Sequence, residues 1–513
     1  SGAPADRHAA ARRFLTPEAE SAWDDSTGIT VLDGLFNTVY PEKVPGPDAQ
    51  STTVRIIGTG VGRLTVTGAF EPDQFPFEVD VGLVRHNGQW RINQLPDGVV
   101  AELSVLREHF RPVRIWFVDP VRHTVVADLR YLPMAPARAQ ASWVIDRLLA
   151  GPSAALAGAA ISQIPPTARL RANVVEAPDG AVVVDLTQIG ELDVPARQLL
   201  AAQVVLSLAE VNVARVRLLV DGEPLLAGRP DLTREDVAGL VAEMQPGAEV
   251  AGLVVSGGRL RQLTGAEPGT PLPGPAGNGE LDVQSAALTA DGRGLAVVAR
   301  SGGMRRLYVG GAAEGGVTPT NLEGSVMTRP TWSPDGREVW TVLNNTRVTR
   351  VLVDNGRPVR MGPVDASELT ALGPIQDLRL SRDGLRVAAV VAETLYTAAV
   401  VRTVDGEVTL RNIRRLRPAD LDRVVAVDWR NTDTLVVVSA LAEGPVSQVS
   451  IDGLDWQLVS PHNLTPPLTA VAAAPGRPLL VSDQNGVWSF SGHGAQTWRQ
   501  VVGASPAVPL YPG

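Results

Sequence analysis

The sequence predicts a multidomain protein that ends in an all-β propeller. Its 513 residues are more than one hydrophobic core usually supports, so several domains are expected. Two regions that mix helices and strands come first, and from about residue 248 onward a single β-strand pattern recurs. We therefore expect a small α+β domain at residues 1–107, an α/β domain plus a linker at 108–245, and the propeller at 246–513.

The first region predicts an antiparallel sheet with a short helix against it. The turn His86-Asn87-Gly88 separates two alternating runs, and Asn-Gly in that setting is a strong hairpin signal. The expected elements are a helix at residues 8–15 and extended runs at 53–57, 63–69, 77–85 and 89–92.

The second region alternates strands and helices in the order ββαββαβ, which is typical of a compact α/β domain. Apolar residues at helical spacing, such as Val144 and Leu148, predict a helix that ends at Gly151-Pro152. The expected strands are residues 114–118, 125–131, 169–176, 181–186 and 215–220, and the expected helices are 137–149 and 195–208.

The third region repeats one unit, an apolar run, a polar turn that usually contains Asp-Gly, and a second apolar run. The clearest copy is Thr331-Trp332-Ser333-Pro334-Asp335-Gly336. The corresponding turn positions Asp291, Asp335, Asp383 and Asp433 are 44, 48 and 50 residues apart, and a fifth turn at Pro475-Gly476 lacks the Asp. Spacings of this size are those of four-stranded propeller blades.

Five blades can be counted directly, and a sixth can be assembled from the two ends of the region. Extended runs at residues 250–255 and 259–263 precede the counted blades, and a further run at 505–510 follows them. Pairing of these runs would close the ring and remove free sheet edges. We favour six blades, one of them composite, over five.

Composition excludes several classes of protein. The net charge of −9 argues against a general affinity for nucleic acid, which requires a basic surface. The sequence contains no Cys, so it offers no disulfide, no thiolate nucleophile and no Cys-ligated metal. No stretch of eighteen apolar residues is present, so nothing in it is expected to span a bilayer.

The usual catalytic and ligand-binding motifs are absent or incomplete. The six histidines are scattered without metal-ligand spacing, and residues 491–494 do not form a nucleophile elbow. The run Gly58-Thr59-Gly60-Val61-Gly62 is followed by Arg63, so a dinucleotide motif fails and a hairpin or bulge is favoured. We therefore predict no catalytic residues, no cofactor and no metal site.

Two groups of propeller residues invite a functional interpretation but fit a structural one better. Asp291, Asp335 and Asp383 fall at the same turn of successive blades, where Asp caps its own backbone. Trp332 and Trp429 occupy equivalent repeat positions, which favours packing between blades over a sugar-binding platform.

Several motifs resemble one protein family over essentially the whole chain. Residues 148–152, Ile164-Pro165-Pro166-Thr167, Val184-Asp185-Leu186 and Gln203 match the GerMN domain of germination and sporulation proteins. The run that ends in Gln89-Trp90-Arg91-Ile92 resembles cone-shaped domains of the nuclear-transport-factor-two type. A GerMN-like domain followed by a propeller resembles the architecture of LpqB-type actinobacterial lipoproteins.

The resemblance implies a location and a partner. Members of this family are lipoproteins anchored to the outer face of the cell membrane through a lipidated N-terminal Cys, a residue that this sequence does not contain. They are implied to contact the ectodomain of an MtrB-type sensor histidine kinase and to modulate MtrA signalling, cell-wall homeostasis and cell division. The expected function is therefore that of a non-enzymatic accessory protein of a two-component system.

The sequence offers one candidate partner-binding surface, a basic cluster in an otherwise acidic chain. It comprises Arg411, Arg414, Arg415 and Arg417, between the third and fourth counted blades, where a connecting loop is expected. Guanidinium groups suit carboxylates and phosphates, so the cluster could dock an acidic ectodomain or the anionic headgroups of a membrane beneath a tethered protein. The alternative is a strand edge whose charges prevent aggregation.

Two other functions remain open from the sequence. The protein could be a module that binds cell-wall glycan, with Trp residues on the propeller surface as the platform. It could instead be a propeller hydrolase or lyase acting on that glycan. The enzymatic alternative requires two carboxylates that converge in the central funnel, at least one of them with a raised pKa.

Overall fold

The computed structural model describes residues 9–34, 36–40, 49–242, 245–247, 249–263, 268–313, 316–417, 421–490, 497–503 and 506–513. The chain forms two compact units. The first contains Ser1–Phe117, Asp128–Ser153 and Ser162–Gly239, and the second contains Val118–Ala127, Ala154–Ile161 and Leu240–Gly513. Two short segments of the middle region therefore belong to the unit that contains the propeller.

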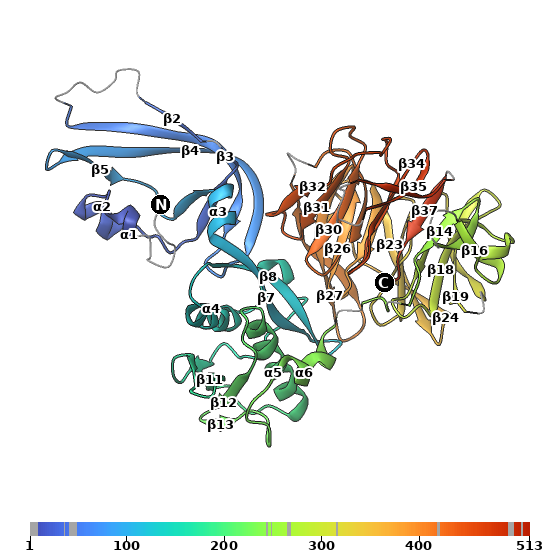
Figure 1. The fold of residues 1–513 in the computed structure, drawn as a ribbon, viewed down its shortest axis with the longest axis horizontal. Coiled ribbons are helices and arrows are strands. Elements are labelled where there is room, and N and C mark those ends of the chain that lie inside the picture. Colours follow the sequence, from blue (N-terminus) through green and yellow to red (C-terminus); the bar gives the residue numbers. More distant parts are fainter. Residues whose placement is uncertain are drawn as a thin grey trace. The chain divides into compact units, whose positions relative to one another are not determined.

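The N-terminal sheet has the strand order β5-β4-β3-β1-β6, with β2 also paired to β3 (Figure 1). Two long strands dominate it, and the separate runs expected at residues 53–57 and 63–69 are wrong. The bounds are β1 (Ile29–Leu32), β2 (Asn37–Val39), β3 (Ser51–Leu64), β4 (Phe70–His86), β5 (Gln89–Gln94) and β6 (Val99–Glu102).

The glycine-rich run that superficially resembles a nucleotide loop lies inside β3. The register against β4 shifts between Gly60 and Gly62, so the feature is a β-bulge. Gly62 has a φ of 150°, a conformation that favours glycine. The hairpin predicted at Asn87-Gly88 is confirmed, since both residues have positive φ and β4 pairs with β5.

The helices of the first region differ from the prediction. The helix expected at residues 8–15 is only α1 (Ala9–Arg12), and a second helix, α2 (Pro17–Ala22), follows it. The Thr16 hydroxyl accepts a hydrogen bond from the Ala19 amide, and Pro17 occupies the first turn, so the missed helix carries an ordinary start signal. A third helix, α3 (Leu103–His109), ends the region.

The middle region contains the expected pattern with one correction. The strand expected at residues 169–176 is two short strands on either side of an irregular stretch. The bounds are β7 (Phe110–Asp119), β8 (Thr124–Pro133), α4 (Ala137–Ala150), η2 (Ala154–Leu156), β9 (Arg169–Leu170), β10 (Val175–Glu176), β11 (Val182–Thr187), α5 (Val194–Ala209), β12 (Val216–Val220), β13 (Glu223–Pro224), α6 (Arg234–Val237) and η3 (Ala238–Leu240). Within it, β11 and β12 run parallel.

The propeller has six four-stranded blades, which confirms the favoured count (Figure 1). Blade 1 contains β14 (Leu253–Ser256), β15 (Arg259–Leu263), β16 (Pro268–Pro271) and β37 (Ala507–Leu510); blade 2 contains β17 (Asp282–Leu288), β18 (Gly294–Ser301), β19 (Met304–Gly311) and β20 (Val317–Gly324). Blade 3 contains β21 (Thr331–Trp332), β22 (Glu338–Leu343), β23 (Arg347–Asp354) and β24 (Arg357–Pro363).

The remaining blades continue the same pattern, with two short helices, α7 (Pro275–Asn278) and α8 (Ser367–Thr370), between strands. Blade 4 contains β25 (Ile375–Leu380), β26 (Arg386–Val391), β27 (Thr394–Arg402) and β28 (Val408–Arg415). Blade 5 contains β29 (Val424–Trp429), β30 (Thr434–Ser439), β31 (Val446–Ser450) and β32 (Trp456–Leu458); blade 6 contains β33 (Ala470–Ala472), β34 (Leu479–Asp483), β35 (Gly486–Phe490) and β36 (Arg499–Val502).

The two ends of the propeller sequence meet in blade 1. Strand β37 pairs antiparallel with β14, with Leu253 opposite Leu510 and Ser256 opposite Ala507, as the sequence predicts. Figure 1 shows β37 beside β14, although the two are the last and the first strands of the propeller sequence. The innermost strand of this blade therefore comes from the C-terminal end of the chain and the other three from the beginning of the propeller.

Packing between blades confirms the structural interpretation of the two repeated tryptophans. Trp332 and Trp429 are buried, and each indole N–H donates to a backbone carbonyl of the preceding blade, of Ala287 at 3.2 Å and of Arg379 at 3.1 Å. The ring of each Trp thus fills a gap between blades while its polar atom is satisfied.

The repeated Asp residues confirm the turn-capping interpretation. The carboxylate of Asp335 accepts hydrogen bonds from the Ser333 hydroxyl at 2.5 Å and from the Arg337 amide at 3.1 Å. Asp291 and Asp383 make the corresponding contacts in blades 2 and 4.

Among the described residues, no helix is long and apolar enough to cross a bilayer.

Closure through β37 can be tested by placing a charge in that strand. Leu510 is 2% exposed, so Leu510→Asp is expected to lower the melting temperature of the propeller by about 10 °C or more. Deleting residues 503–513 should have a similar effect because it removes the whole innermost strand. Val404 is 97% exposed, so Val404→Asp serves as the matched control. Equal melting temperatures for the two Asp variants, measured by calorimetry, would contradict closure through this strand.

Candidate functional site at the mouth of the propeller channel

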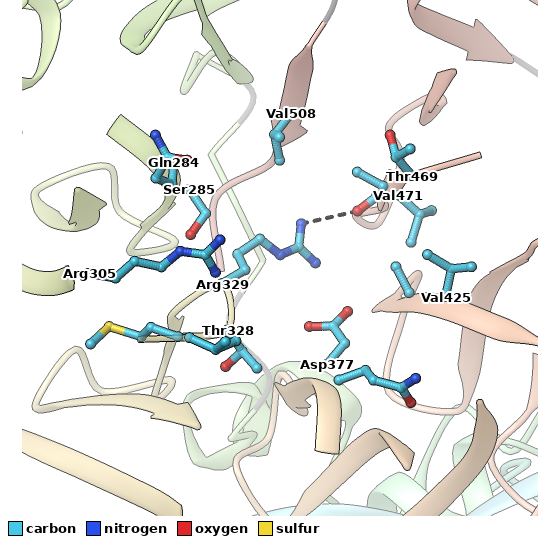
Figure 2. Close-up of a pocket in the computed structure, with 15 residues that line it drawn as sticks. Gln284, Ser285, Arg305, Thr328, Arg329, Asp377, Val425, Thr469, Val471 and Val508 are labelled. Atoms are coloured by element: carbon cyan, nitrogen blue, oxygen red, sulfur yellow. Dashed lines mark hydrogen bonds between the residues drawn. The ribbon is translucent and has the colours of Figure 1, made fainter. Parts of the chain in front are cut away.

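A pocket of about 400 Å³ lies where the innermost strands of the six blades begin. The innermost strands of neighbouring blades contact one another, so the residues at their starts form a ring. All six blades contribute to the lining, which is a mixture of neutral polar and small apolar groups with three charged side chains, Arg305, Arg329 and Asp377. Figure 2 shows Arg329 extending across the centre of this pocket, with Asp377 below it. The remaining lining residues are Gln284, Ser285, Val326, Met327, Thr328, Gln376, Val425, Ala426, Thr469, Ala470, Val471 and Val508.

The repeat explains why these residues meet. In blades 2 to 5, the residue three positions before the anchor residue of each repeat (Leu288, Trp332, Leu380 or Trp429) lines the pocket. Equivalent positions on strands of equal direction reach the same level of a ring. The residues that occupy this position are Ser285, Arg329, Asp377 and Ala426.

A buried ionic network lies against the pocket. The Asp428 carboxylate lies 3.3 Å from a guanidinium nitrogen of Arg329 and 3.3 Å from one of Arg379. It also accepts hydrogen bonds from the backbone amides of Trp429 and Ala473. Burial alone would raise the pKa of Asp428, but the surrounding guanidinium groups outweigh burial and lower it. Asp428 is therefore an ionised carboxylate committed to structural partners from several blades.

Asp377 behaves differently from Asp428. Burial raises its pKa, and the charge of Asp428 adds to this, while Arg329 and Arg379 oppose it only in part. Its carboxylate oxygens accept hydrogen bonds from the Leu378 amide at 3.0 Å and the Val427 amide at 3.2 Å. A carboxyl group with a raised pKa at the wall of a pocket keeps its proton to a higher pH than an ordinary Asp side chain does.

Sequence reasoning missed this pair of carboxylates. It considered Asp291, Asp335 and Asp383 instead, which cap turns and do not line the pocket. The available signal was an Asp inside an innermost strand, as at Asp377 in β25 and Asp428 in β29. One feature that the enzymatic alternative requires, a channel carboxyl group with a raised pKa, is thus present. The second carboxylate is not among the pocket residues.

Most of the predicted basic cluster lies in a strand and not on a connecting loop. Arg411, Arg414 and Arg415 lie in β28, the outermost strand of blade 4, and only Arg417 follows the strand. The strand continues to Arg415, so the expected connecting loop contains Arg417 but not the other three arginines. The strand edge is the setting that the aggregation-prevention alternative describes.

The four arginines of the cluster have different surroundings. Arg411 is exposed and pairs with the exposed Glu368, and Arg415 is exposed. Arg414 is half-buried, whereas Arg417 is buried and lies 5.5 Å from the centroid of the Trp456 ring. Arg417 is thus part of the packing of the blades, and Arg411 and Arg415 are the members that a partner could reach most easily.

A second buried ionic cluster joins blades 3 and 4. Glu338 accepts hydrogen bonds from Arg402 at 2.7 and 2.9 Å, from Arg350, and from the Trp340 indole at 2.9 Å. Burial would raise the pKa of Glu338, but Arg402, Arg350 and Trp340 outweigh it and lower the pKa to about 2. The cluster stabilises the contact between two blades and shows no sign of catalytic tuning.

The GerMN-like motif residues are structural. The Gln203 side chain is fully buried and donates to the Trp116 carbonyl, while its carbonyl accepts from the Gln163 amide at 2.6 Å. Gly151 ends α4, and its carbonyl accepts from the buried Arg130, which also pairs with Asp128 at 2.8 Å. The motif therefore secures the helices and strands of the first unit to one another. No group of three or more potential metal ligands occurs among the described residues.

Comparison with family models divides the chain into three matches. Residues 1–107 match the model described as "Lipoprotein LpqB, N-terminal domain", residues 114–226 match "Sporulation and spore germination", and residues 258–512 match "Lipoprotein LpqB beta-propeller domain".

Curated relatives match over nearly the whole chain. Lipoprotein LpqB of Rhodococcus jostii is 34% identical over 99% of this chain and 87% of its own length. The proteins of the same name from Mycolicibacterium smegmatis and Mycobacterium tuberculosis are 34% and 33% identical, each over 99% of this chain and 89% of its own length.

Similarity to solved structures is weaker. A chain of a nidogen/laminin complex aligns with a TM-score of 0.38 at 12% identity, over 50% of this chain and 97% of the other. A putative TolB from Agrobacterium tumefaciens aligns with a TM-score of 0.32 at 17% identity, over 42% of this chain and 78% of the other.

The structural role of Asp428 predicts a large loss of stability on neutralisation. Asp428→Asn leaves Arg329 and Arg379 buried without their carboxylate, and breaking a buried ion pair in this way costs about 3–5 kcal/mol. The melting temperature of the propeller should fall by about 10 °C. Asp354→Asn, at an exposed position in blade 3, should leave it unchanged. A stable Asp428→Asn variant would show that the network is dispensable.

The Glu338 cluster predicts a specific pH dependence. The pKa of the Glu338 carboxyl group in the folded protein, about 2, lies below its ordinary value of 4.5. The ionised carboxylate therefore contributes its full stabilisation above pH 4.5, and this contribution is lost as the pH falls towards 2. Glu338→Gln should therefore be less stable than the wild type at pH 7, and the gap in melting temperature should narrow between pH 4.5 and 2. Comparing the two proteins removes the effect of the other carboxylates. A gap that stays constant would contradict the assignment.

Proposed function

The chain belongs to the LpqB lipoprotein family, and on that premise we propose that it is a non-enzymatic accessory partner of a two-component sensor kinase. In this proposal it is held at the outer face of the cell membrane by a lipidated N-terminal Cys. It contacts the ectodomain of an MtrB-type kinase and thereby modulates MtrA signalling, cell-wall homeostasis and cell division.

The observation that carries the proposal is the match over all three regions of the chain. The relatives are named lipoproteins, and their alignments cover 99% of this chain at 34% identity. The whole arrangement of domains is therefore common to them. A shared arrangement of a helix-and-sheet unit and a rigid ring of blades suits binding, because the ring holds exposed strands and loops in fixed positions. The name of these relatives, lipoprotein, supports the proposed location at the cell membrane.

The state of the channel carboxylates supports a binding role over catalysis. A glycoside hydrolase needs two carboxyl groups that both reach the sugar. Here Asp428 is bound by two arginines and two backbone amides. Asp377 is the one carboxyl group among the residues that line the pocket. Asp377, with its raised pKa, is the observation that keeps a propeller hydrolase or lyase as a second candidate. Binding of cell-wall glycan is a further alternative.

The basic cluster remains our proposed contact surface for the kinase, and we now assign the contact chiefly to its exposed members. Arg411 and Arg415 are exposed on the outermost strand of blade 4, and both can present a planar donor group to carboxylates. Arg417 is a poor choice for substitution, because it packs on Trp456 and its replacement would disturb the blades. The clean variant is therefore Arg411→Ser with Arg415→Ser.

This surface can be tested with a matched pair of double variants. Arg411→Ser/Arg415→Ser is expected to weaken binding to the purified kinase ectodomain by about 1–3 kcal/mol and to reduce its salt dependence, since interfacial charge contacts are lost. The control is Arg357→Ser/Arg360→Ser, which removes two exposed arginines from β24, the corresponding outermost strand of blade 3. Biolayer interferometry at two salt concentrations measures both.

The outcomes separate the proposed functions. Equal weakening by both double variants would show a non-specific charge effect and refute the surface. Failure of the wild-type chain to bind the ectodomain would refute the kinase partnership. Binding to purified cell wall without ectodomain binding would favour the glycan module, and turnover of peptidoglycan or arabinogalactan fragments, lost in Asp377→Asn, would establish the enzyme.

A further inference from the structure

The channel pocket carries more positive than negative charge. Its lining contains Arg305 and Arg329 but only one carboxyl group, that of Asp377, which is buried in the wall. Asp428 and Arg379 lie against it and balance each other. Burial and the charge of Arg329 lower the pKa of Arg379 to about 10, as expected where guanidinium groups are crowded.

Arg305 is the cation that the network does not use. It is half-buried at the start of β19, and no ion pair or side-chain hydrogen bond joins it to any residue in the described part of the chain. Its cross-strand neighbours on the two sides are Gly324, which has no side chain, and Arg300, which lies 3.5 Å from Asp282. The adjacent Arg306 is paired with Glu323 at 2.7 Å.

Arg329 adds a second positive charge to the same pocket. One terminal nitrogen donates to the Val471 carbonyl at 3.0 Å (Figure 2). The other, Nη2, makes a 3.3 Å ion-pair contact with Asp428 but no hydrogen bond. Both Arg305 and Arg329 extend into the pocket in Figure 2. Arg305, unlike Arg329, is a partly buried cation for which the described residues provide no ion pair, and an anion in the pocket would relieve the cost of its burial.

Neutral hydrogen-bonding groups complete the lining. Gln284, Ser285, Gln376 and Thr469 come from three blades and line the pocket with the two arginines. The Thr328 hydroxyl also lines it but already accepts a hydrogen bond from the Val342 amide at 2.9 Å. Amide and hydroxyl side chains of this kind bind hydroxyl groups and fix the orientation of a ligand. The volume of about 400 Å³ is within the range of small-molecule sites.

We propose that the channel mouth is a binding site for a small hydroxylated anion, a solute that carries a carboxylate or a phosphate. Arg305 binds the anionic group, Arg329 contributes positive potential from the centre of the ring, and the amide and hydroxyl side chains bind the ligand's hydroxyl groups. The two sources of the charge, carboxylate and phosphate, share this chemistry. The site is separate from the arginines of β28, so it does not depend on the proposed kinase contact.

The test uses calorimetric titration of the full chain at low salt with three probes, glucuronate, inorganic phosphate and neutral glucose. We expect saturable binding of at least one of the two anions and none of glucose. Arg305→Gln should weaken binding of that anion by about tenfold or more, because a charged hydrogen-bond donor is lost. Arg306→Gln makes the same change of charge at the adjacent residue, outside the pocket lining, and should alter the dissociation constant less than twofold.

The possible results are distinguishable. Binding of glucuronate alone assigns the carboxylate source, and binding of phosphate alone assigns the phosphate source. Absence of binding by both anions, or equal weakening by Arg305→Gln and Arg306→Gln, overturns the proposal. If Arg305→Gln has a lowered melting temperature, Ser285→Asp decides instead, because it adds a negative charge to the pocket lining and should weaken binding of the anion. Unchanged binding in a folded Ser285→Asp variant overturns the proposal. None of these results bears on kinase binding, which has its own variants.

Discussion

The propeller depends on one backbone ladder, the pairing of β37 with β14 in blade 1. A blade buries its faces only against its neighbours, so an open ring would leave two blades uncovered. Closure by the last strand also brings Val508 to the channel mouth, where it lines the pocket beside residues of the other blades. The pocket, the buried ion pairs and the fixed positions of the outermost strands all require that the ring be closed.

Inside the closed ring, burial and neighbouring guanidinium groups together set the pKa of each carboxyl group. Asp428 stays ionised because guanidinium groups surround it, whereas burial raises the pKa of Asp377. Buried ion pairs contribute little net stability compared with apolar packing, but they penalise any arrangement that separates the partners. The Arg379–Asp428 contact joins blades 4 and 5, so it favours the native order of blades.

The sequence was sufficient for the propeller and the blade count, because the repeat is long, periodic and marked by Asp-Gly turns. It was less sufficient in the N-terminal sheet, where glycines inside β3 look like breaks although the strand continues through a bulge. The channel residues were missed because repeat positions were compared for similarity. Arg329 and Asp377 are charged, whereas Ser285 and Ala426, at the same repeat position, are small and uncharged. This difference in charge is what indicates the channel residues.

This contrast separates what builds the ring from what gives it chemistry. The anchor position favours a large apolar residue in most repeats, as at Trp332 and Trp429, because every blade must pack on the one before it. The position three residues earlier lines the channel and is not restricted to one type of residue, so the blades carry different side chains there. A ring of equivalent positions with unlike residues has a directional distribution of charge, and a symmetric ring does not. Arg305, reached from a different strand of blade 2, adds to this asymmetry and makes one side of the mouth the place where an anion would bind.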